Sequence, residues 1–385
     1  MRVSCHPALS PHADYQGVHY TGDVSRYSSL PPHSGPDLVM RVFVTGIAGF
    51  LGSRIAADLI DAGHEVSGND TLIGGYIDNV PENAEFHHAD CKYLNAMKKM
   101  VAGHDVVIHT ACTAYEGLSV FSPHLVCQNT FQISTTVFAA CASEGVGRVI
   151  NCSSMARYGE QETYPFHEDM TPMPVDPYGV SKLAAEQVLE ILAKVHEFEF
   201  VNLVPHNIVG AHQKYDDPFR NVAGIFINLM LQGRQPMIYG DGNQRRCFSD
   251  VRDILGSFRR ALVSESVAGE TVNIGPDEEF VSILELAEVI ADVVNFPGLD
   301  PVFVDPRPCE VKYATCSAEK ARALLGYDTG YSLRESLEDM SAWVERRGTK
   351  RFRFHLDVEI VNEKTPKTWT DRLLASNPSK QTSSA

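Results

Sequence analysis

The stretch from Met40 to Asp70 constrains the fold of this chain more than any other. It opens with an apolar, β-branched run at 41–45, and apolar residues at helical spacing later lead up to Gly63. Between these two parts stand three glycines spaced G-x-x-G-x-x-G: Gly46, Gly49 and Gly52. Residues 64–70 then form a second strand-like run that ends on an acid. The order predicts a strand, a glycine turn, a helix closed by Gly63 and a second strand.

Such a unit is suited to a dinucleotide, because glycines let the backbone approach a pyrophosphate at the positive end of a helix. Asp70, which stands 24 residues after Gly46, can accept hydrogen bonds from both ribose hydroxyls and would repel a 2′-phosphate. This favours NAD(H) over NADP(H). The alternative is a glycine-rich turn without a ligand, and the register of strands, helix and acid argues against it.

Composition narrows the classes of partner. A net charge of −16 argues against nucleic acid and against docking on an acidic membrane surface. The nine cysteines are scattered without a C-x-x-C pair, which predicts free thiols in a reducing compartment, the cytoplasm, rather than disulfides or a zinc site. No apolar run approaches the roughly 18 residues that span a bilayer, and we expect no metal.

The pattern of strands and helices predicts an α/β fold. Residues 1–39 are rich in proline, serine and histidine and predict a flexible N-terminal extension, with metal binding by the histidines as the weaker alternative. Over 40–205, strands and helices alternate; besides those named above they are expected at 84–90, 105–111, 123–144, 148–154, 181–196 and 200–205. Repeated βα units predict a Rossmann-type, doubly wound parallel sheet with helices on both faces.

Beyond residue 205 the rhythm changes. Residues 206–350 predict a smaller, interleaved C-terminal α/β domain that binds a second ligand, with segments at about 240–270 returning to the first domain. Residues 351–385 predict a strand-like arm followed by a polar tail.

Tyr178 and Lys182 carry the most specific catalytic signal. Residues four apart share a helix face, and a neighbouring cation is expected to lower the pKa of a phenol; Lys182 could also bond the nicotinamide ribose. The alternative is a helix with Tyr178 in the core and Lys182 on the surface. Ser154 ends the predicted strand 148–154, where its hydroxyl could bridge substrate and phenol; Ser153 is its rival, and capping of the backbone is the alternative role.

The chain resembles extended short-chain dehydrogenases/reductases of the nucleotide-sugar epimerase/dehydratase family, in particular its UDP-glucose/UDP-galactose 4-epimerase-like members. The matching stretches, in order between about residues 40 and 345, are TGIAGFLG, HEVSGND, DVVIHTA, CSSMARYG, YGVSK, PHNIVG, GDGNQRRCF and RPCEVKY. The resemblance implies a tightly held NAD, a nucleoside-diphosphate sugar, most simply a UDP-sugar, as substrate, and a homodimer.

The resemblance also assigns roles to further residues. For the cofactor it adds Phe50 and Leu51 in the glycine turn, Asp90 at the adenine, its neighbour Cys91, Ala111, Asn129 and Pro205, with His206 near the nicotinamide. For the substrate it gives Ser153, Ser154, Tyr178, Asn207, the diphosphate-binding Arg246 and Arg307, and Glu310 at the nucleotide ribose.

Departures from the family pattern restrict the reaction. Met155 and Ala156 stand where family dehydratases carry an Asp-Glu pair, and family uronate decarboxylases usually keep the glutamate. Cys247 and Cys309 replace a common acid and a common glycine, and we expect packing roles for both. The prediction is therefore an NAD-dependent epimerase acting at C4 of a UDP-hexose or UDP-uronate through a transient 4-keto sugar. A sugar-nucleotide reductase or dehydrogenase and a non-catalytic NAD-binding protein are the alternatives.

Overall fold

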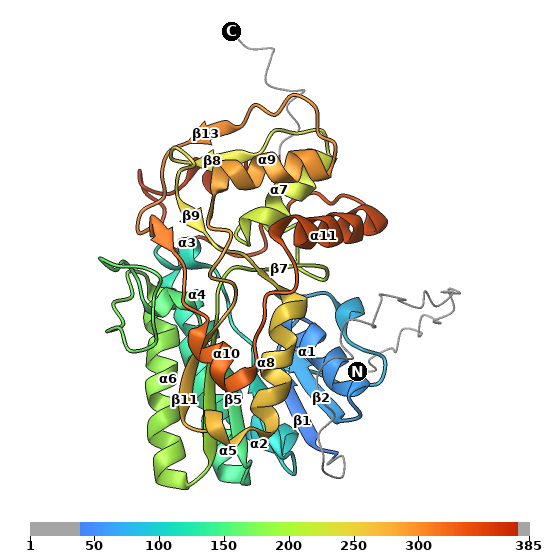
Figure 1. The fold of residues 1–385 in the computed structure, drawn as a ribbon, viewed down its shortest axis with the longest axis vertical. Coiled ribbons are helices and arrows are strands. Elements are labelled where there is room, and N and C mark those ends of the chain that lie inside the picture. The colour runs from blue at the N-terminus through green and yellow to red at the C-terminus, as the bar shows by residue number, and fades with distance from the viewer. Residues whose placement is uncertain (1–38, 376–385) are drawn as a thin grey trace, which may run out of the picture. The chain divides into compact units, whose positions relative to one another are not determined.

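The computed structural model describes residues 39–375, which form one compact unit. Its centre is a seven-stranded parallel sheet in the order β11-β6-β5-β4-β1-β2-β3 (Figure 1). The strands are β1 Arg41–Thr45, β2 Glu65–Asp70, β3 Glu85–His88, β4 Val106–His109, β5 Arg148–Cys152, β6 Glu199–Pro205 and β11 Glu270–Ile274. The chain moves outward from β1 in both directions, so the order reverses between β1 and β4, where doubly wound sheets bind ligands. The predicted fold class is confirmed.

Helices cover both faces of the sheet. On one face lie α1 (Phe50–Asp61), α8 (Val251–Val263) and α10 (Glu319–Leu325), and on the other lie α2 (Leu94–Val101), α5 (Ile133–Glu144) and α6 (Pro177–His196). Alternate residues of β1 separate the two cores, since Val42 and Val44 face the first and Phe43 faces the second. The rigid sheet thereby fixes the loops at its carboxyl edge.

Two helices of this sandwich begin or end as their sequences require. Helix α1 ends at Asp61, and Gly63 follows with φ +90°, which only glycine adopts without cost. Helix α6 starts at Pro177 after Asp176, whose carboxylate accepts a hydrogen bond from Gly179 N at 2.9 Å. This cap orients the first turn of α6, which carries Tyr178.

The predicted helix over 123–144 is interrupted. It consists of α4 (Pro123–Cys127), a π-helical turn at Gln128–Gln132 and α5. In the π turn, Ile133 N bonds Gln128 O instead of Asn129 O, and the Asn129 carbonyl accepts a hydrogen bond from Thr113 N at 3.1 Å. The turn therefore holds the loop that follows β4.

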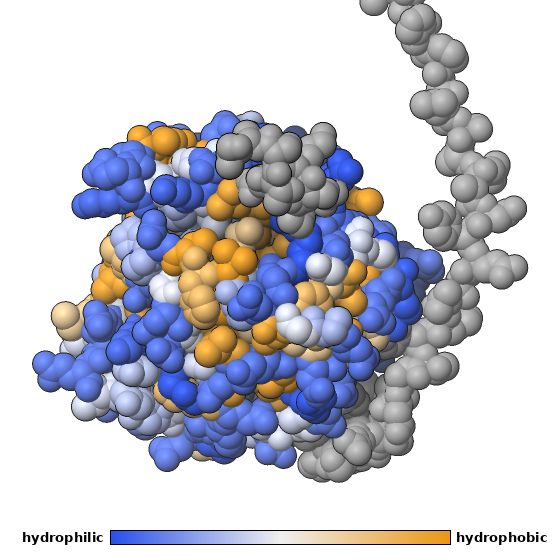
Figure 2. Space-filling model, turned by 90° about the horizontal axis from the view of Figure 1, so that it is seen from above, coloured by the Kyte–Doolittle hydropathy of each residue, from blue (hydrophilic) through white to orange (hydrophobic). Residues whose placement is uncertain are grey.

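A second hydrophobic core lies beyond the carboxyl edge. It contains α7 (Val222–Leu231), α9 (Ile283–Val293) and α11 (Leu333–Arg347). The short strands here are β7 Ile208–Val209, β8 Met237–Tyr239, β9 Arg245–Arg246, β10 Ser249–Asp250, β12 Val281–Ser282, β13 Val302–Val304 and β14 Tyr313–Ala314. Strand β13 pairs with β8 and exposes Phe303. Figure 2 views this end of the molecule, where apolar residues gather near the middle of the face among hydrophilic ones.

The remaining elements are short: α3 Glu116–Ser119, α12 Lys367–Thr370 and the 3₁₀ turns Ile77–Asn79, Met155–Arg157 and Glu265–Val267. The strand-like arm predicted after residue 350 is wrong over 351–375, because this segment pairs with no strand and instead packs aromatic side chains such as Phe354 and Trp369 against Phe219. Except for residue 39, the predicted N-terminal extension lies outside the described residues, as does the end of the predicted tail.

Candidate functional site

One cavity of about 460 Å³ opens at the carboxyl edge of the sheet, at the reversal between β1 and β4. All residues that the sequence singled out for the cofactor line it: Gly46, Gly49, Phe50, Leu51, Gly52, Asp70, Asp90, Cys91, Ala111, Asn129, Tyr178, Lys182 and Pro205. All those singled out for the substrate line it as well: Ser153, Ser154, Tyr178, Asn207, Arg246, Arg307 and Glu310. The fold thus brings both sets together, and their individual roles remain predictions.

The glycine turn leaves no space for side chains. A Cβ atom on Gly52 would lie 2.2 Å from Gly46 O, and one on Gly46, whose φ is +73°, would lie 3.0 Å from Ala111 Cα. The backbone of the turn therefore lies bare against the cavity at the start of α1. This is the cradle that a dinucleotide pyrophosphate requires, so the residues present fit NAD.

Asp70 ends β2 at the other side of this cradle. Its carboxylate accepts hydrogen bonds from Ala48 N at 3.1 Å and Leu72 N at 2.7 Å. Burial raises the pKa of Asp70, while these backbone bonds and the nearby Arg220 guanidinium act in the opposite direction. The side chain is thus held in one place at the cavity wall, where it can accept bonds from ribose hydroxyls.

Tyr178 and Lys182 do lie on one face of α6 and both reach the cavity. The Lys182 ammonium donates to Cys152 O at 2.7 Å and lies 5.9 Å from the centre of the Tyr178 ring. The expected lowering of the Tyr178 pKa by the cation is wrong for this structure: burial raises that pKa well above its usual value, and the adjacent Ser154 hydroxyl opposes the rise. The phenol is therefore held protonated.

The two serines after β5 point to different partners. Ser153 donates its hydroxyl to Glu186, a buried carboxylate that also pairs with Arg157 at 3.0 Å. Ser154 Oγ accepts a hydrogen bond from Ala156 N at 3.2 Å. The Ser154 side chain also hydrogen-bonds Tyr178 and thereby opposes the rise of the Tyr178 pKa. The geometry favours Ser154 over Ser153 as the partner of the phenol. Glu186 was missed, although it continues the four-residue spacing of Tyr178 and Lys182.

Charged side chains line the opposite part of the cavity. Arg307 donates to Glu310 at 2.9 Å and its guanidinium lies 4.5 Å from the Tyr239 ring. Arg246 donates to backbone oxygens, among them Arg245 O at 2.8 Å and Lys312 O at 3.2 Å. Two guanidinium groups converging on one space suit a diphosphate.

His206 differs from its expected place near the nicotinamide. It is buried, does not line the cavity, and its Nε2 lies 2.8 Å from Pro276 O. The next residue, Asn207, does line the cavity and donates to Cys247 O at 2.9 Å. Both residues follow the end of β6, and Asn207 has φ +43°, so the backbone turns here and these neighbours point to different sides.

The two unusual cysteines differ. Cys247 is buried, and its thiol donates to Glu278 O at 2.9 Å, so it packs inside the protein. Cys309 is exposed and has φ +60°. This left-handed conformation explains physically why glycine is common at that position, since a Cβ is strained there.

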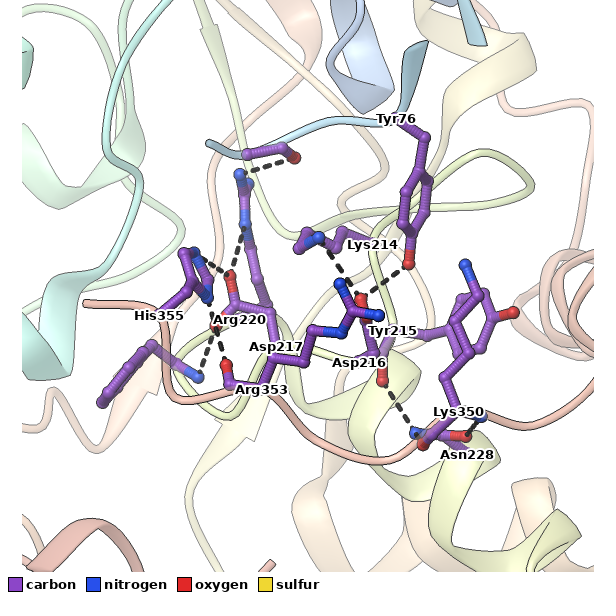
Figure 3. A network of polar contacts seen from close by, with 12 residues as sticks. Tyr76, Lys214, Tyr215, Asp216, Asp217, Arg220, Asn228, Lys350, Arg353 and His355 are labelled. Carbon is purple, nitrogen blue, oxygen red and sulfur yellow. Dashed lines mark hydrogen bonds and ion pairs between the residues drawn. The ribbon is translucent and has the colours of Figure 1, made fainter. Parts of the chain in front are cut away.

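Two adjacent carboxylates, Asp216 and Asp217, form a polar network with side chains from several segments of the chain (Figure 3). Asp216 accepts from Tyr76 Oη at 2.7 Å and pairs with Lys214 at 3.4 Å. Asp217 accepts from the hydroxyl of Tyr115, in the loop after β4, at 2.5 Å. Sequence reasoning missed this pair, because its partners come from distant segments.

Arg220 connects this network to the cofactor side. It lines the cavity, lies 3.7 Å from Asp217 and donates to Gly74 O at 3.0 Å. The His355 ring of the C-terminal segment lies 3.7 Å from the same carboxylate (Figure 3). The loops after β2 and β4 and the C-terminal segment are thus joined through one acidic pair.

The similarity of the chain to known proteins identifies its family. The sequence profile described as "NAD dependent epimerase/dehydratase family" matches residues 42–275. The chain belongs to this family. It is 32% identical to a UDP-glucose 4-epimerase of Mycolicibacterium smegmatis over 313 residues, covering 77% of this chain and 96% of that protein. The predicted family, NAD as the cofactor and the class of nucleotide-sugar epimerase are confirmed.

Two solved structures resemble the fold closely. A UDP-glucose 4-epimerase of Thermotoga maritima with UDP-glucose has a TM-score of 0.75 at 27% identity, covering 80% of this chain and 99% of that one. A UDP-glucuronic acid 4-epimerase of Bacillus cereus with UDP-glucuronic acid and NAD has a TM-score of 0.74 at 27% identity, covering 80% and 100%. Fold similarity alone therefore does not choose between a neutral and an acidic sugar.

Proposed function

We propose that this protein interconverts UDP-hexoses by inverting C4 through a transient 4-keto sugar, with Tyr178 as the acid–base group. The observation that carries the proposal is the convergence of Ser154, Tyr178 and Lys182 with the glycine cradle and two arginines in one cavity. Related 4-epimerases with UDP-sugars support the choice of substrate class and carbon.

Residues in two parts of the cavity would bind the cofactor and the nucleotide sugar. The cradle at Gly46–Gly52, Asp70 and Lys182 would bind NAD, and Arg246 and Arg307 would bind the diphosphate. When bound, NAD supplies a hydride acceptor and donor, which permits oxidation of the sugar carbon and its reduction from the other face. We propose residues 206–350 as the substrate-binding part.

Tyr178 would take the proton of the sugar 4-hydroxyl and return it after inversion, with the Ser154 hydroxyl between them. Because burial raises the pKa of Tyr178, the phenolate needs positive charge, which the Lys182 ammonium on the same helix face and the positively charged nicotinamide of bound NAD⁺ would supply together. Met155 and Ala156 have no ionisable group and Met155 is buried, so neighbours of Ser154 cannot assist loss of water or carbon dioxide.

The test is incubation of the purified holoenzyme with UDP-glucose and UDP-galactose without added NAD, followed by chromatography of the sugar nucleotides. Interconversion without net NADH is expected. Tyr178→Phe should lower kcat by about 10²- to 10⁴-fold, the usual contribution of general acid–base catalysis. Steady accumulation of NADH would instead indicate a dehydrogenase.

Tyr158→Phe is the matched control. Tyr158 is a buried tyrosine of the same region that donates to Asn273 Oδ1 at 2.8 Å and does not line the cavity. It should keep its turnover. Parental turnover in Tyr178→Phe would overturn the mechanism.

We also propose a cytoplasmic homodimer. The eight cysteines among the described residues are all unpaired, which suits a reducing compartment. Helix α6 exposes Val180, Ile191 and Val195 along its outer side, an apolar stripe that a second copy could cover. Light scattering gives the mass in solution. None of the helices between residues 39 and 375 has the length and apolar character to cross a membrane.

A further inference from the structure

Glu116 is an ionisable group in the cavity that the proposed reaction does not use. It begins α3, in the loop after β4, lines the cavity and is exposed to the space within it. The sequence motifs did not single it out, because a lone acid in a loop carries no spacing signal. Its position raises the question of which part of a substrate it faces.

Contacts on both sides place Glu116 between the catalytic phenol and the diphosphate arginines. A Cβ atom on the next residue, Gly117, would lie 2.8 Å from Arg307 Nη1. Ser119 bonds both Glu116 O, at 2.7 Å, and the Asp176 carboxylate that caps α6, at 3.2 Å. In a nucleotide sugar, the sugar connects the diphosphate to the reacting hydroxyl, so the Glu116 carboxyl group, which acts electrostatically on Tyr178, Arg246 and Arg307, would lie beside the sugar.

The loop that carries Glu116 is held firmly. Thr113 N donates to Asn129 O at 3.1 Å, and the Tyr115 hydroxyl donates to Asp217 at 2.5 Å. Glu116 therefore presents its carboxyl group from a fixed backbone.

Each basic side chain that lines the cavity already has a hydrogen-bond or ion-pair partner. Among the described lining residues, the carboxyl groups are Asp70, Asp90, Glu116, Asp176 and Glu310, and the basic side chains are Lys182, Arg220, Arg246 and Arg307. Lys182 bonds Cys152 O, Arg220 pairs with Asp217, and Arg307 pairs with Glu310. A diphosphate would engage the two arginines near it, so a uronate carboxylate beside Glu116 would meet no basic side chain without a partner among the described lining residues.

We propose that Glu116 is a specificity-determining residue that selects neutral UDP-hexoses and rejects UDP-uronates by like-charge repulsion. The proposal rests on the proposed function, since it assumes a UDP-sugar in this cavity. A neutral hexose presents hydroxyl donors to the carboxylate, whereas a uronate presents a second carboxylate, and two like charges side by side disfavour binding.

The ionisation of Glu116 gives the selection a pH dependence. Desolvation, and after it the carboxylates of Asp176 and Glu310, raise the pKa of Glu116 to about 7. The guanidinium groups of Arg246 and Arg307 act in the opposite direction. Glu116 also faces Tyr178, whose pKa it raises together with Cys112. Below about pH 7 the carboxyl group is protonated and neutral, so discrimination should be weak there and should strengthen as the pH rises.

UDP-glucose and UDP-glucuronate form the decisive pair, because they differ only at C6. We would measure kcat/KM for both between pH 6 and 9 and take their ratio, which cancels the titration of Tyr178. The wild-type ratio should favour UDP-glucose and rise through about pH 7. Glu116→Gln should lower the ratio by about tenfold or more at pH 8 and remove its pH dependence, whereas Glu116→Asp should keep both.

Glu338→Gln is the charge-matched control, because Glu338 pairs with Arg334 on α11 and does not line the cavity; its ratio should equal that of the wild type. Calorimetric binding of both nucleotides in the Tyr178→Phe background tests selection without turnover. If turnover fails but binding favours UDP-glucose only with Glu116 present, the proposed reaction falls and the selection stands. Equal ratios for wild type and Glu116→Gln, or a wild-type preference for UDP-glucuronate, would overturn the selection.

Discussion

The part of the cavity proposed to bind the cofactor and the part proposed to bind the sugar are formed by different groups. The cofactor half is shaped by backbone: at Gly46 and Gly52 a single Cβ atom would approach other backbone atoms to 3.0 Å and 2.2 Å. The sugar half is shaped by charged side chains, with Arg307 paired to Glu310 and Glu116 near both arginines. Backbone geometry permits one ligand shape, whereas side-chain charge can be changed residue by residue. We infer that the fold selects the cofactor and that a few ionisable groups select the sugar.

The largest expected effect breaks the backbone-built half. Gly52→Ala places a Cβ 2.2 Å from Gly46 O, a separation that backbone atoms cannot accept, so the turn must distort. We expect copurified NAD to fall by more than about tenfold, because backbone approach to the pyrophosphate depends on this turn. The measurement is mass spectrometry of the nucleotides released from the purified protein.

Gly256→Ala is the matched control for this change. Gly256 lies inside α8 and a Cβ there meets nothing within 4 Å. It should retain NAD and gain about 1 kcal/mol in the free energy of unfolding from helix propensity. Full NAD content in Gly52→Ala would show that the cradle is not what holds the cofactor.

A smaller effect is expected from the charge-built half. Arg307→Met removes one guanidinium from the cavity, and we expect KM for the UDP-sugar to rise by about 10- to 100-fold, the value of a charge-assisted hydrogen bond. NAD content should stay unchanged. Arg245→Met is the control, since Arg245 also lies over an aromatic ring, Phe280, and pairs with Glu285, but does not line the cavity. Loss of NAD from Arg307→Met would show that the two halves are not separable.

The smallest expected effect is a change in stability at Cys309, a residue with a strained backbone in the part of the cavity that is formed by charged side chains. Cys309 has φ +60°, so Cys309→Gly should relieve strain and raise the free energy of unfolding by about 0.5–1 kcal/mol, after the entropy cost of glycine. Denaturant unfolding measures the change. Cys309→Ala keeps the strain and should bring no gain; an equal gain in both variants would attribute it to loss of the thiol.

The same contrast explains what the sequence could predict. The cradle and the Tyr178–Lys182 face depend on spacing along one strand or helix, and spacing is visible in a sequence. The predicted direction of the Tyr178 pKa shift was wrong because the shift depends on burial, which is a property of the folded protein. Glu116 and the Asp216–Asp217 pair were missed because their partners come from segments far apart in the chain. The interruption at Gln128–Gln132 leaves no mark in the apolar pattern.

That π turn makes the length of one helix matter for the choice of sugar. If one residue were deleted between Asn129 and Ile133, the present bond from Ile133 N to Gln128 O would become an ordinary i→i−4 bond, and Ser134 N would compete for the Asn129 carbonyl that now accepts from Thr113 N. The loop that presents Glu116 would then lose one of its two anchors without any substitution in the cavity. For this protein, an insertion or deletion beneath the site could change selectivity as much as a mutation inside it.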